Sequence, residues 1–177
     1  AVSGGAGSTL AADLFIEQSW TDASLGHVRT DMWGVTDNAP LVYPIIGFTN
    51  YGGAARYRIW DADTANGWVD LLTPISAGGW VSFEIEFSGT SFVYSIDGNA
   101  VYTDSTIGTA TGFSAVIMQA YNFFDPTTDG GSATNFVASN YVAHWDNARV
   151  GNVPEPASLA LLGTALAGLV IARRRRG

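Results

Sequence analysis

Hydrophobic and polar positions alternate most regularly in residues 80–87. The apolar positions of this segment are Val81, Phe83, Ile85 and Phe87, and the polar positions between them are Ser82, Glu84 and Glu86. A period of two is that of a β-strand with one buried and one wet face. The alternation resumes at residues 92–96, and Asp97-Gly98 is a strong signal for a tight hairpin turn. We expect residues 100–103 to be the returning strand.

Short runs rich in Val, Ile, Phe, Tyr and Trp recur along the rest of residues 10–150, between Gly, Asp, Asn and Pro clusters and without a helical period. They predict further strands at residues 12–20, 27–34, 43–48, 55–60, 68–72, 114–121 and 140–150. About ten antiparallel strands usually stack as two sheets, because each alternating strand then has an inner and an outer face. The predicted fold class is all-β, an antiparallel two-sheet sandwich of jelly-roll type.

The last part of the chain has a different pattern. Residues 157–172 contain no charge, and Arg173, Arg174, Arg175 and Arg176 close the run. At about 1.5 Å per residue this segment makes a helix of roughly 24 Å, so the arginines must snorkel to complete a ~30 Å hydrocarbon span. We predict one C-terminal transmembrane helix with the Arg cluster as a cytoplasmic membrane stop. The alternative is a buried helix of a soluble domain.

Val153-Pro154-Glu155-Pro156 directly precedes this apolar helix. The order of motif, short Ala/Leu/Gly helix and terminal Arg cluster resembles the PEP-CTERM sorting tail of exosortase-processed bacterial proteins. The resemblance implies that Pro154, Glu155 and Pro156 form the processing motif for an exosortase. It also implies an inner-membrane-anchored precursor that loses its tail on export to the cell surface or exopolysaccharide matrix. Because such a tail is useful only on an exported protein, we expect a secretory signal upstream of Ala1.

Residues 1–152 and the tail differ sharply in charge. Residues 1–152 carry four Arg against fifteen Asp and Glu, a net charge of −11, whereas the tail carries four Arg against Glu155. A domain this acidic is repelled by phosphate backbones, which argues against nucleic acid as a partner. The chain has no Cys and no Lys, which excludes disulfides, thiol nucleophiles and Schiff-base catalysis. We expect a flexible segment at 1–9, one sandwich domain at 10–151 and the sorting tail at 152–177.

The hairpin block at residues 80–102 resembles the centre of concanavalin A-like and laminin G-like domains. Concanavalin A-like folds include glucanases, so the resemblance raises a glycan-acting hydrolase as an alternative function. Laminarinase-like glucanases carry Glu-x-Asp-x-x-Glu on a strand. Here Glu84 and Glu86 begin a similar pattern, but Gly89 stands where the third carboxylate is required. We therefore predict no catalytic residues and place both glutamates on a solvated outer face.

Aromatic side chains beside turn signals are candidates for glycan binding, because flat rings bind the faces of sugars in shallow clefts. The candidates are Tyr51, Trp60, Trp68, Tyr121, Phe123 and Phe124. The alternative for each ring is a place in the hydrophobic core.

Two loops gather the oxygen donors that calcium prefers. The candidate ligands are Asp61, Asp63, Asn66, Asp125 and Asp129. Ordinary turns need the same residue types, so structural turns are the alternative. Calcium is the one cofactor that the sequence suggests.

These patterns together predict an exported surface or extracellular-matrix protein that is not an enzyme. We expect it to bind glycan, or to assemble with its neighbours in a purely structural role. Its expected partners are the exosortase, the membrane through the C-terminal helix, and polysaccharide or further copies of itself. The competing prediction is a glucanase-like hydrolase on the same fold.

Overall fold

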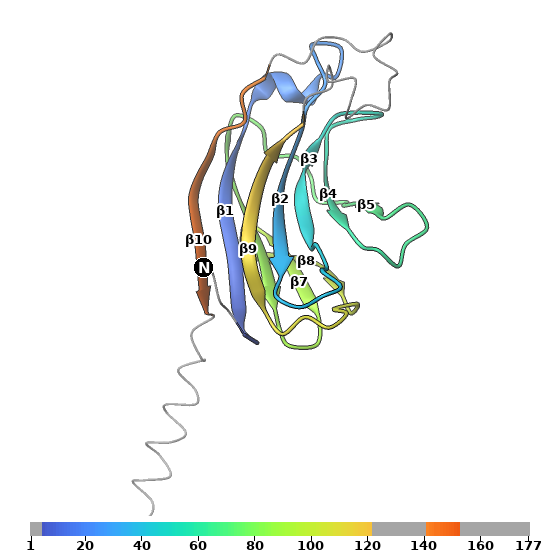
Figure 1. Ribbon diagram of the computed structural model, residues 1–177. Coiled ribbons are helices and arrows are strands. Elements are labelled where there is room, and N and C mark those ends of the chain that lie inside the picture. Colours follow the sequence, from blue (N-terminus) through green and yellow to red (C-terminus); the bar gives the residue numbers. More distant parts are fainter. Residues whose placement is uncertain (1–4, 122–140, 153–177) are drawn as a thin grey trace, which may run out of the picture.

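The computed structural model describes residues 5–121 and 141–152, which form two five-stranded sheets packed face to face (Figure 1). Sheet A contains, in spatial order, β5 (Trp68–Asp70), β4 (Arg56–Trp60), β3 (Ile45–Thr49), β2 (Arg29–Thr36) and β9 (Phe113–Ala120). Sheet B contains β10 (Trp145–Asn152), β1 (Ser8–Ile16), β6 (Gly79–Phe87), β7 (Phe92–Ile96) and β8 (Asn99–Asp104). Neighbouring strands are antiparallel in both sheets. The predicted antiparallel two-sheet sandwich is confirmed.

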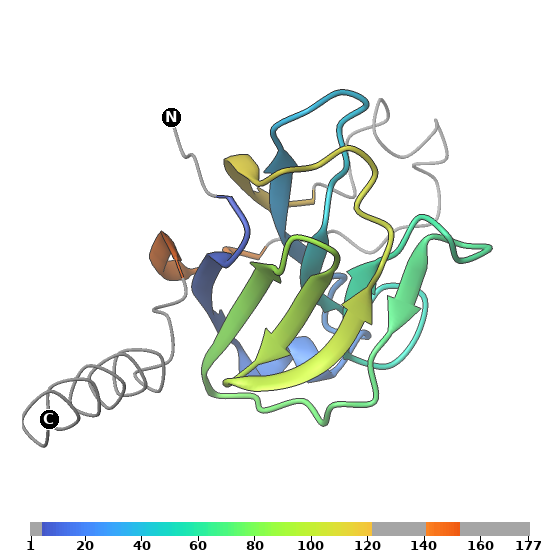
Figure 2. The ribbon, with the colours of Figure 1, turned by 90° about the horizontal axis from the view of Figure 1, so that it is seen from below.

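The strand with the clearest alternation, β6, lies in the middle of sheet B and has the two faces that its sequence predicts. Val81, Phe83 and Ile85 are fully buried, whereas Glu84 and Glu86 lie on the outer face and are half-buried. Figure 2 shows the two layers from below, with β6, β7 and β8 in green. The alternation placed each side chain correctly because one face of the strand has to supply the core.

Aromatic rings connect the two sheets through the core. The ring of Tyr57 on β4 meets that of Phe83 on β6 edge to face, with centroids 5.6 Å apart. At the other end Phe113 of β9 contacts Phe87 and Phe92 of sheet B, at 6.4 and 5.9 Å. Burying one such side chain contributes about 1.5–3 kcal/mol. Packing of this kind holds the sandwich together without disulfides.

The turn between β7 and β8 confirms the predicted hairpin. Asp97 and Gly98 have φ angles of 50° and 75°. Positive φ at both central residues is the requirement of a type I′ turn, whose twist matches that of the two strands.

The segment after β1 differs from the expected strand at residues 12–20. The strand ends at Ile16, and Gln18–Thr21 form a 3₁₀-helix, η1, in which Trp20 is buried. Trp20 keeps the even spacing of Leu14 and Ile16, which is why the pattern suggested one longer strand. Here the chain leaves sheet B and crosses to sheet A, and Asn50 holds the crossing by donating to the backbone oxygen of Trp20 at 3.0 Å.

The ends of the sandwich lie slightly outside the expected limits. The first strand begins at Ser8 and the last ends at Asn152, where the expected domain spans 10–151. Within residues 5–121 and 141–152, no helix has the length and apolarity needed to cross a membrane. The transmembrane helix predicted at 157–172 lies outside the described residues.

Candidate functional site

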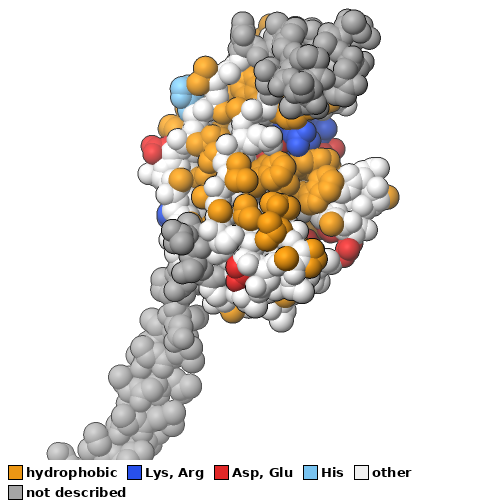
Figure 3. Space-filling model, in the orientation of Figure 1, with side chains coloured by type: hydrophobic (Ala, Val, Ile, Leu, Met, Phe, Trp, Pro, Cys, Tyr) orange, Lys and Arg blue, Asp and Glu red, His pale blue; other side chains and the backbone are white. Residues whose placement is uncertain are grey.

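The outer face of sheet A carries three rows of side chains that run across its strands. The register of the strands defines an apolar row of Ile117, Trp33, Ile45, Trp60 and Trp68, a polar row of Gln119, Asp31, Gly47, Arg58 and Asp70, and a basic row of Arg29, Thr49 and Arg56. Figure 3 shows hydrophobic side chains gathered over β9, β2, β3 and β4, with blue arginine atoms beside the upper part of this area. Aromatic and cationic groups thus share one face.

The apolar row presents indole rings at the surface. Trp60 and Trp68 meet edge to face with centroids 5.1 Å apart, and both are partly exposed. Gly67, which has a φ of +71°, lies against the Trp60 ring, and a Cβ at this position would collide with it. The glycine therefore allows the β4–β5 turn to bring Trp68 beside Trp60. Trp33 continues the row on β2, with Tyr43 at 6.1 Å.

The polar row brings an arginine and an aspartate together across an intervening strand. Asp31 on β2 pairs with Gly47 on β3, which pairs in turn with Arg58 on β4. A Cβ on Gly47 would collide with the Asp31 carboxylate, so the missing side chain leaves the space through which Arg58 reaches over β3. The resulting ion pair measures 3.4 Å from Nη2 of Arg58 to Oδ2 of Asp31.

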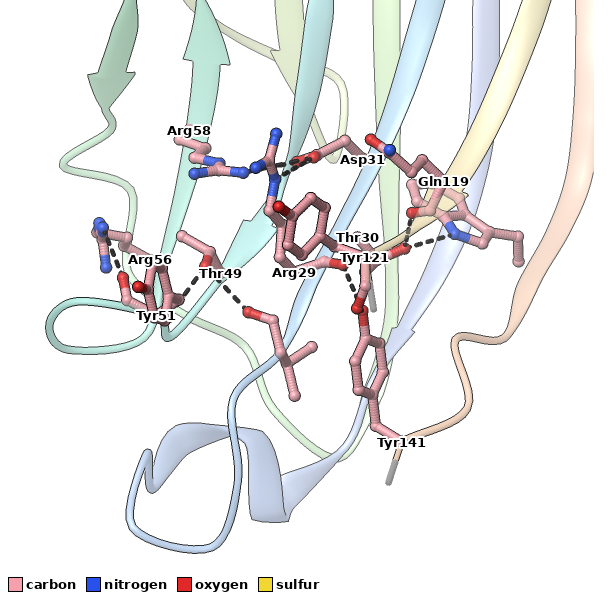
Figure 4. A network of polar contacts seen from close by, with 12 residues as sticks. Arg29, Thr30, Asp31, Thr49, Tyr51, Arg56, Arg58, Gln119, Tyr121 and Tyr141 are labelled. Carbon is pink, nitrogen blue, oxygen red and sulfur yellow. Dashed lines mark hydrogen bonds and ion pairs between the residues drawn. The ribbon is translucent and has the colours of Figure 1, made fainter. Parts of the chain in front are cut away.

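Arg29 is the second cation of this cluster and lies between two rings. Its Nε donates to Oδ2 of Asp31 at 3.0 Å. Its guanidinium carbon is 5.0 Å from the Trp68 ring centroid and 4.7 Å from that of Tyr121, and Arg58 lies 3.7 Å from the Trp68 centroid. Figure 4 shows Arg29 and Arg58 both pointing toward Asp31, with Tyr121 beside Arg29. Trp68 therefore orients both guanidinium groups through cation–π contacts.

Burial dominates the electrostatics of this cluster. Loss of solvent raises the pKa of the Asp31 carboxyl, although Arg58 and Arg29 oppose the shift. The same cause lowers the pKa of Arg58 to about 10, against the attraction of Asp31. Both shifts disfavour the charged forms, as expected where desolvation exceeds the attraction within the pair. Charges in such a site interact with a further ion more strongly than they would in water.

A network of hydrogen bonds fixes the strands that carry the cluster. The single O–H of Tyr141 is shared between the backbone oxygens of Arg29 and Tyr121, which lie 2.5 and 2.9 Å from the phenol oxygen. Thr30 donates from its hydroxyl to the backbone oxygen of Gln119 at 2.8 Å (Figure 4). Because these partners lie on β2, at the end of β9 and just before β10, the arrangement of the outer face depends on residues more than a hundred positions apart.

The structure brings together three of the six predicted glycan-binding rings. Trp60 and Trp68 lie in the apolar row, and Tyr121 flanks Arg29. Tyr51 lies beyond the end of β3, where its ring meets His27 at 5.3 Å, and belongs to none of the rows. The candidates Phe123 and Phe124 lie outside the described residues.

Sequence reasoning missed Trp33, Arg29, Asp31 and Arg58. A signal was present, because 29–33 and 56–60 each carry charged residues and a tryptophan at every second position, so that all of them share a strand face. That face can stack on a sugar ring and direct guanidinium N–H groups at its oxygens.

A separate acidic cluster lies just beyond the C-terminal end of β4, after Trp60. Carboxylate oxygens of Asp61, Asp63 and Asp104 lie within 4.8 Å of one another. Tyr102 donates to Asp61 at 2.6 Å, and this bond is the main reason why the pKa of Tyr102 is raised to about 12. Asp63 accepts from the hydroxyl of Thr106. The third carboxylate of the cluster is Asp104 from β8, which was not among the predicted ligands, and a role for Asn66 stays a prediction.

Oxygen donors of this kind suit calcium. Calcium binding at Asp61 and Asp63 stays a prediction. The other candidates, Asp125 and Asp129, lie outside the described residues.

Comparisons with known proteins concern the tail and the fold separately. Residues 152–176 match the PEP-CTERM protein-sorting motif. Among curated proteins, none matches the sequence. The sandwich is similar to a human galectin-16 variant, with 13% identity, a TM-score of 0.48, and coverage of 85% of this chain and 91% of the galectin.

Two glycoside hydrolases show a likeness of the same order. A Bacteroides ovatus GH16 protein of a mixed-linkage glucan PUL has 15% identity and a TM-score of 0.48, covering 82% of this chain and 70% of that protein. A glycoside hydrolase family protein from Mycobacterium thermorestibile has 16% identity and a TM-score of 0.49, covering 84% and 64%. These likenesses describe the fold alone. The chain thus carries a PEP-CTERM protein-sorting motif at residues 152–176 behind a β-sandwich that resembles galectin and GH16 structures.

Proposed function

We propose that this protein binds glycan, without catalysis, through the outer face of sheet A, at the cell surface or in the extracellular matrix. The PEP-CTERM motif indicates a secreted protein that an exosortase processes. The observation that carries the binding site is the row of Trp33, Trp60 and Trp68 beside the Arg29–Asp31 pair. Flat rings next to directed polar groups are what a sugar needs for stacking and for orientation.

Unpaired polar atoms on the same face support this proposal. Within the described residues, Nε1 of Trp33, Nε of Arg58 and Oε1 of Gln119 are buried and have no hydrogen-bond partner. A buried polar group without a hydrogen-bond partner lowers the stability of the folded state. Its presence in a native structure therefore suggests that a ligand supplies the missing hydrogen bond. Sugar hydroxyls could donate to the glutamine oxygen and accept from the two N–H groups once the side chains that cover these atoms move aside.

The carboxylates argue against the hydrolase alternative. The three rows contain two carboxylates, Asp31 on β2 and Asp70 on β5, which are three strand positions apart, or about 14 Å. Retaining and inverting glycosidases need a separation of about 5.5 Å and about 6.5–9.5 Å, respectively. On sheet B, Ala11 and Ser95 lie directly opposite Glu84, and Asp13, two positions along β1, shares the outer face with the two glutamates. The laminarinase-like pattern still lacks its third carboxylate, because Gly89 stands at that position.

Titration of the full chain with a panel of oligosaccharides, followed by calorimetry, tests the binding site. We expect Trp68→Ala to lower the affinity about 5- to 150-fold, since stacking on one aromatic ring contributes about 1–3 kcal/mol in comparable recognition. The matched control is Trp80→Ala. Trp80 is 52% exposed and contacts Phe15 on the outer face of sheet B, far from the three rows. Equal losses of glycan affinity in the two variants would contradict a binding site on the outer face of sheet A.

Incubation with laminarin and related β-glucans separates binding from catalysis. We expect no product from the full chain, and unchanged binding in Glu84→Gln and Glu86→Gln. Turnover that disappears in either variant would replace this proposal by the hydrolase. Self-association without binding of any glycan would replace it by a structural role.

A further inference from the structure

The arginines of the sandwich are unevenly distributed. Three of the four in residues 1–152, Arg29, Arg56 and Arg58, lie on the outer face of sheet A, and the fourth, Arg149, lies on β10 of sheet B. With Asp31 and Asp70 the three rows have a net charge of +1, although residues 1–152 together have −11. The aromatic face is therefore a local cationic area on an acidic domain.

Arg56 and Arg29 are the exposed cations of this face, with side chains 23% and 20% exposed, against 8% for Arg58. The nitrogens of Arg56 already bind Asp70 and the backbone oxygens of Ala54 and Tyr51, which leaves Arg29 as the cation that a ligand can engage. The Nε of Arg29 is bound to Asp31, whereas no hydrogen bond within the described residues uses its two terminal nitrogens. These two nitrogens form a planar fork that matches a carboxylate, and the rings of Trp68 and Tyr121 hold the fork in place.

Arg58, which is more deeply buried than Arg29, also indicates that this cluster can accept a carboxylate from a ligand. Its Nε is buried without a partner, and its Nη2 is 3.4 Å from the Asp31 carboxylate, which is long for a charge-assisted bond. Two guanidinium groups thus share one internal carboxylate and leave one positive charge uncompensated. A second carboxylate, supplied by a ligand, would balance the cluster.

The charge of the whole domain limits how many carboxylates the ligand can carry. A net charge of −11 repels a chain with an anion on every sugar, because repulsion acts over the whole surface at low ionic strength. A single carboxylate among neutral sugars meets the local cationic area and leaves the neutral rings to stack on the tryptophans. Both properties belong to a mixed glycan with scattered hexuronic acids.

From this geometry we infer that the outer face of sheet A binds a glycan in which isolated hexuronate residues stand among neutral sugars, with the carboxylate held by Arg29. The inference rests on the proposed glycan-binding function and adds the substrate class. Arg29 acts as the specificity-determining residue, and the row of tryptophans binds the neutral sugars on either side.

The test uses the full chain and oligosaccharides that each contain one glucuronate or galacturonate, on several neutral backbones. Every oligosaccharide is paired with the same molecule after reduction of its carboxyl to a primary alcohol, so that the two ligands differ in one charged group. We expect the acid to bind about tenfold more tightly than the alcohol, as a charge-assisted bond implies. The preference should fall as salt is added.

Two variants assign the preference to Arg29. Arg29→Gln should reduce the ratio of the two affinities to about one, and Arg29→Lys should keep a part of it, since a point charge remains without the fork. Arg149→Gln is the matched control, because it removes one positive charge from sheet B. We expect it to leave the ratio unchanged.

The outcomes separate this inference from the proposed function. Equal affinity for acid and alcohol overturns the hexuronate inference and leaves glycan binding intact, whereas binding of neither overturns both. A ratio that falls equally in Arg149→Gln would show that the total charge of the domain, and not Arg29, sets the preference. If a polyuronate with a charge on every sugar bound more tightly than the oligosaccharides with one hexuronate, the inference that the hexuronates are isolated would also be wrong.

Discussion

The indole N–H of Trp145 donates a hydrogen bond of 2.9 Å to the hydroxyl oxygen of Thr30. Trp145 lies on β10 of sheet B and Thr30 on β2 of sheet A, so this bond crosses the core and joins the two sheets. The neighbours of Thr30 in the chain are Arg29 and Asp31, which lie on the outer face. The last strand before the sorting tail therefore supports the proposed binding site from behind.

Replacement of Trp145 by Phe should keep most of the packing against Phe83 and remove the hydrogen bond. We expect the free energy of unfolding to fall by about 1–2 kcal/mol, because the Thr30 hydroxyl loses a buried donor. Urea denaturation measures the change. Trp80→Phe, on the exposed face of sheet B, should change it by less than about 0.5 kcal/mol. Similar midpoints for the two variants would contradict the role of the inter-sheet bond.

Replacement of Gly47 by Ala should destabilise the protein and disturb the polar row. The added Cβ collides with the Asp31 carboxylate and with the backbone of Thr30, which cannot move without breaking the strand pairing. Overpacking of this kind costs about 1–3 kcal/mol. The control is Gly79→Ala on β6, where the added Cβ meets nothing within 4 Å. A Gly47→Ala variant as stable as its control would show that Arg58 does not need this gap.

The two faces of β6 provide a further test of the fold. Phe83 is fully buried and contacts Tyr57 and Trp145, so that Phe83→Ala should cost about 3–5 kcal/mol. Glu84 lies on the outer face, and Glu84→Ala should stay within about 0.5 kcal/mol. Chemical denaturation of both variants measures the difference. Comparable midpoints would mean that the buried face of β6 has been misassigned.

The acidic cluster predicts a defined dependence of stability on pH. Burial, with repulsion from Asp61 and Asp63, raises the pKa of Asp104 above 3.8. The folded state therefore binds this proton more tightly than the unfolded state, and the stability that the proton gives is lost as pH rises through the raised pKa. Asp104→Asn should unfold at higher temperature than the unaltered protein at neutral pH, and the gap should close below pH 3.8.

Asp22→Asn should unfold at a lower temperature than the unaltered protein at neutral pH, which is the opposite of the effect expected for Asp104→Asn. Hydrogen bonds from Ser24 lower the pKa of Asp22, so that its contribution is present at neutral pH and is lost as pH falls through the lowered value. Thermal scans across the acid range compare the two variants.

Repeating these scans in millimolar calcium tests the calcium prediction, because a bound cation would reverse the order of the unfolding temperatures of Asp104→Asn and the unaltered protein.

The processing motif gives a prediction for the native host. The tail that follows Asn152 should be removed from the mature protein, because Pro154-Glu155-Pro156 lies within the matched sorting motif. The intact mass of the surface-exposed form should be lower than that of the full chain by roughly the mass of the tail. Recovery of extracellular protein with Arg173 to Arg176 still attached would contradict it.

The local pattern was sufficient for the strands whose two faces differ strongly. On β6 a large apolar residue stands at every second position, and only one way of placing that strand buries all of them. The Asp97-Gly98 turn was predictable for a similar reason, since few residues adopt positive φ at both positions. The sorting motif also needs no tertiary structure, because the order of its parts along the chain defines it.

Trp20 shows where the pattern misled. Its spacing continues that of β1, but the chain has to leave sheet B after Ile16, and a crossing between sheets leaves no trace in the alternation. Likewise Asp104 joins Asp61 and Asp63 through the packing of the β8 end beside the β4–β5 turn, about forty residues away along the chain.

The sequence by itself determined the class of fold, the buried faces of β6 and β7 and the sorting tail, because these depend on neighbours along the chain. Only the tertiary structure placed Arg29, Asp31 and Arg58 together. Their meeting depends on the order β4-β3-β2 and on a register that puts Gly47 between Asp31 and Arg58. Strand order and register are set by the packing of the whole core, which no stretch of a few residues contains.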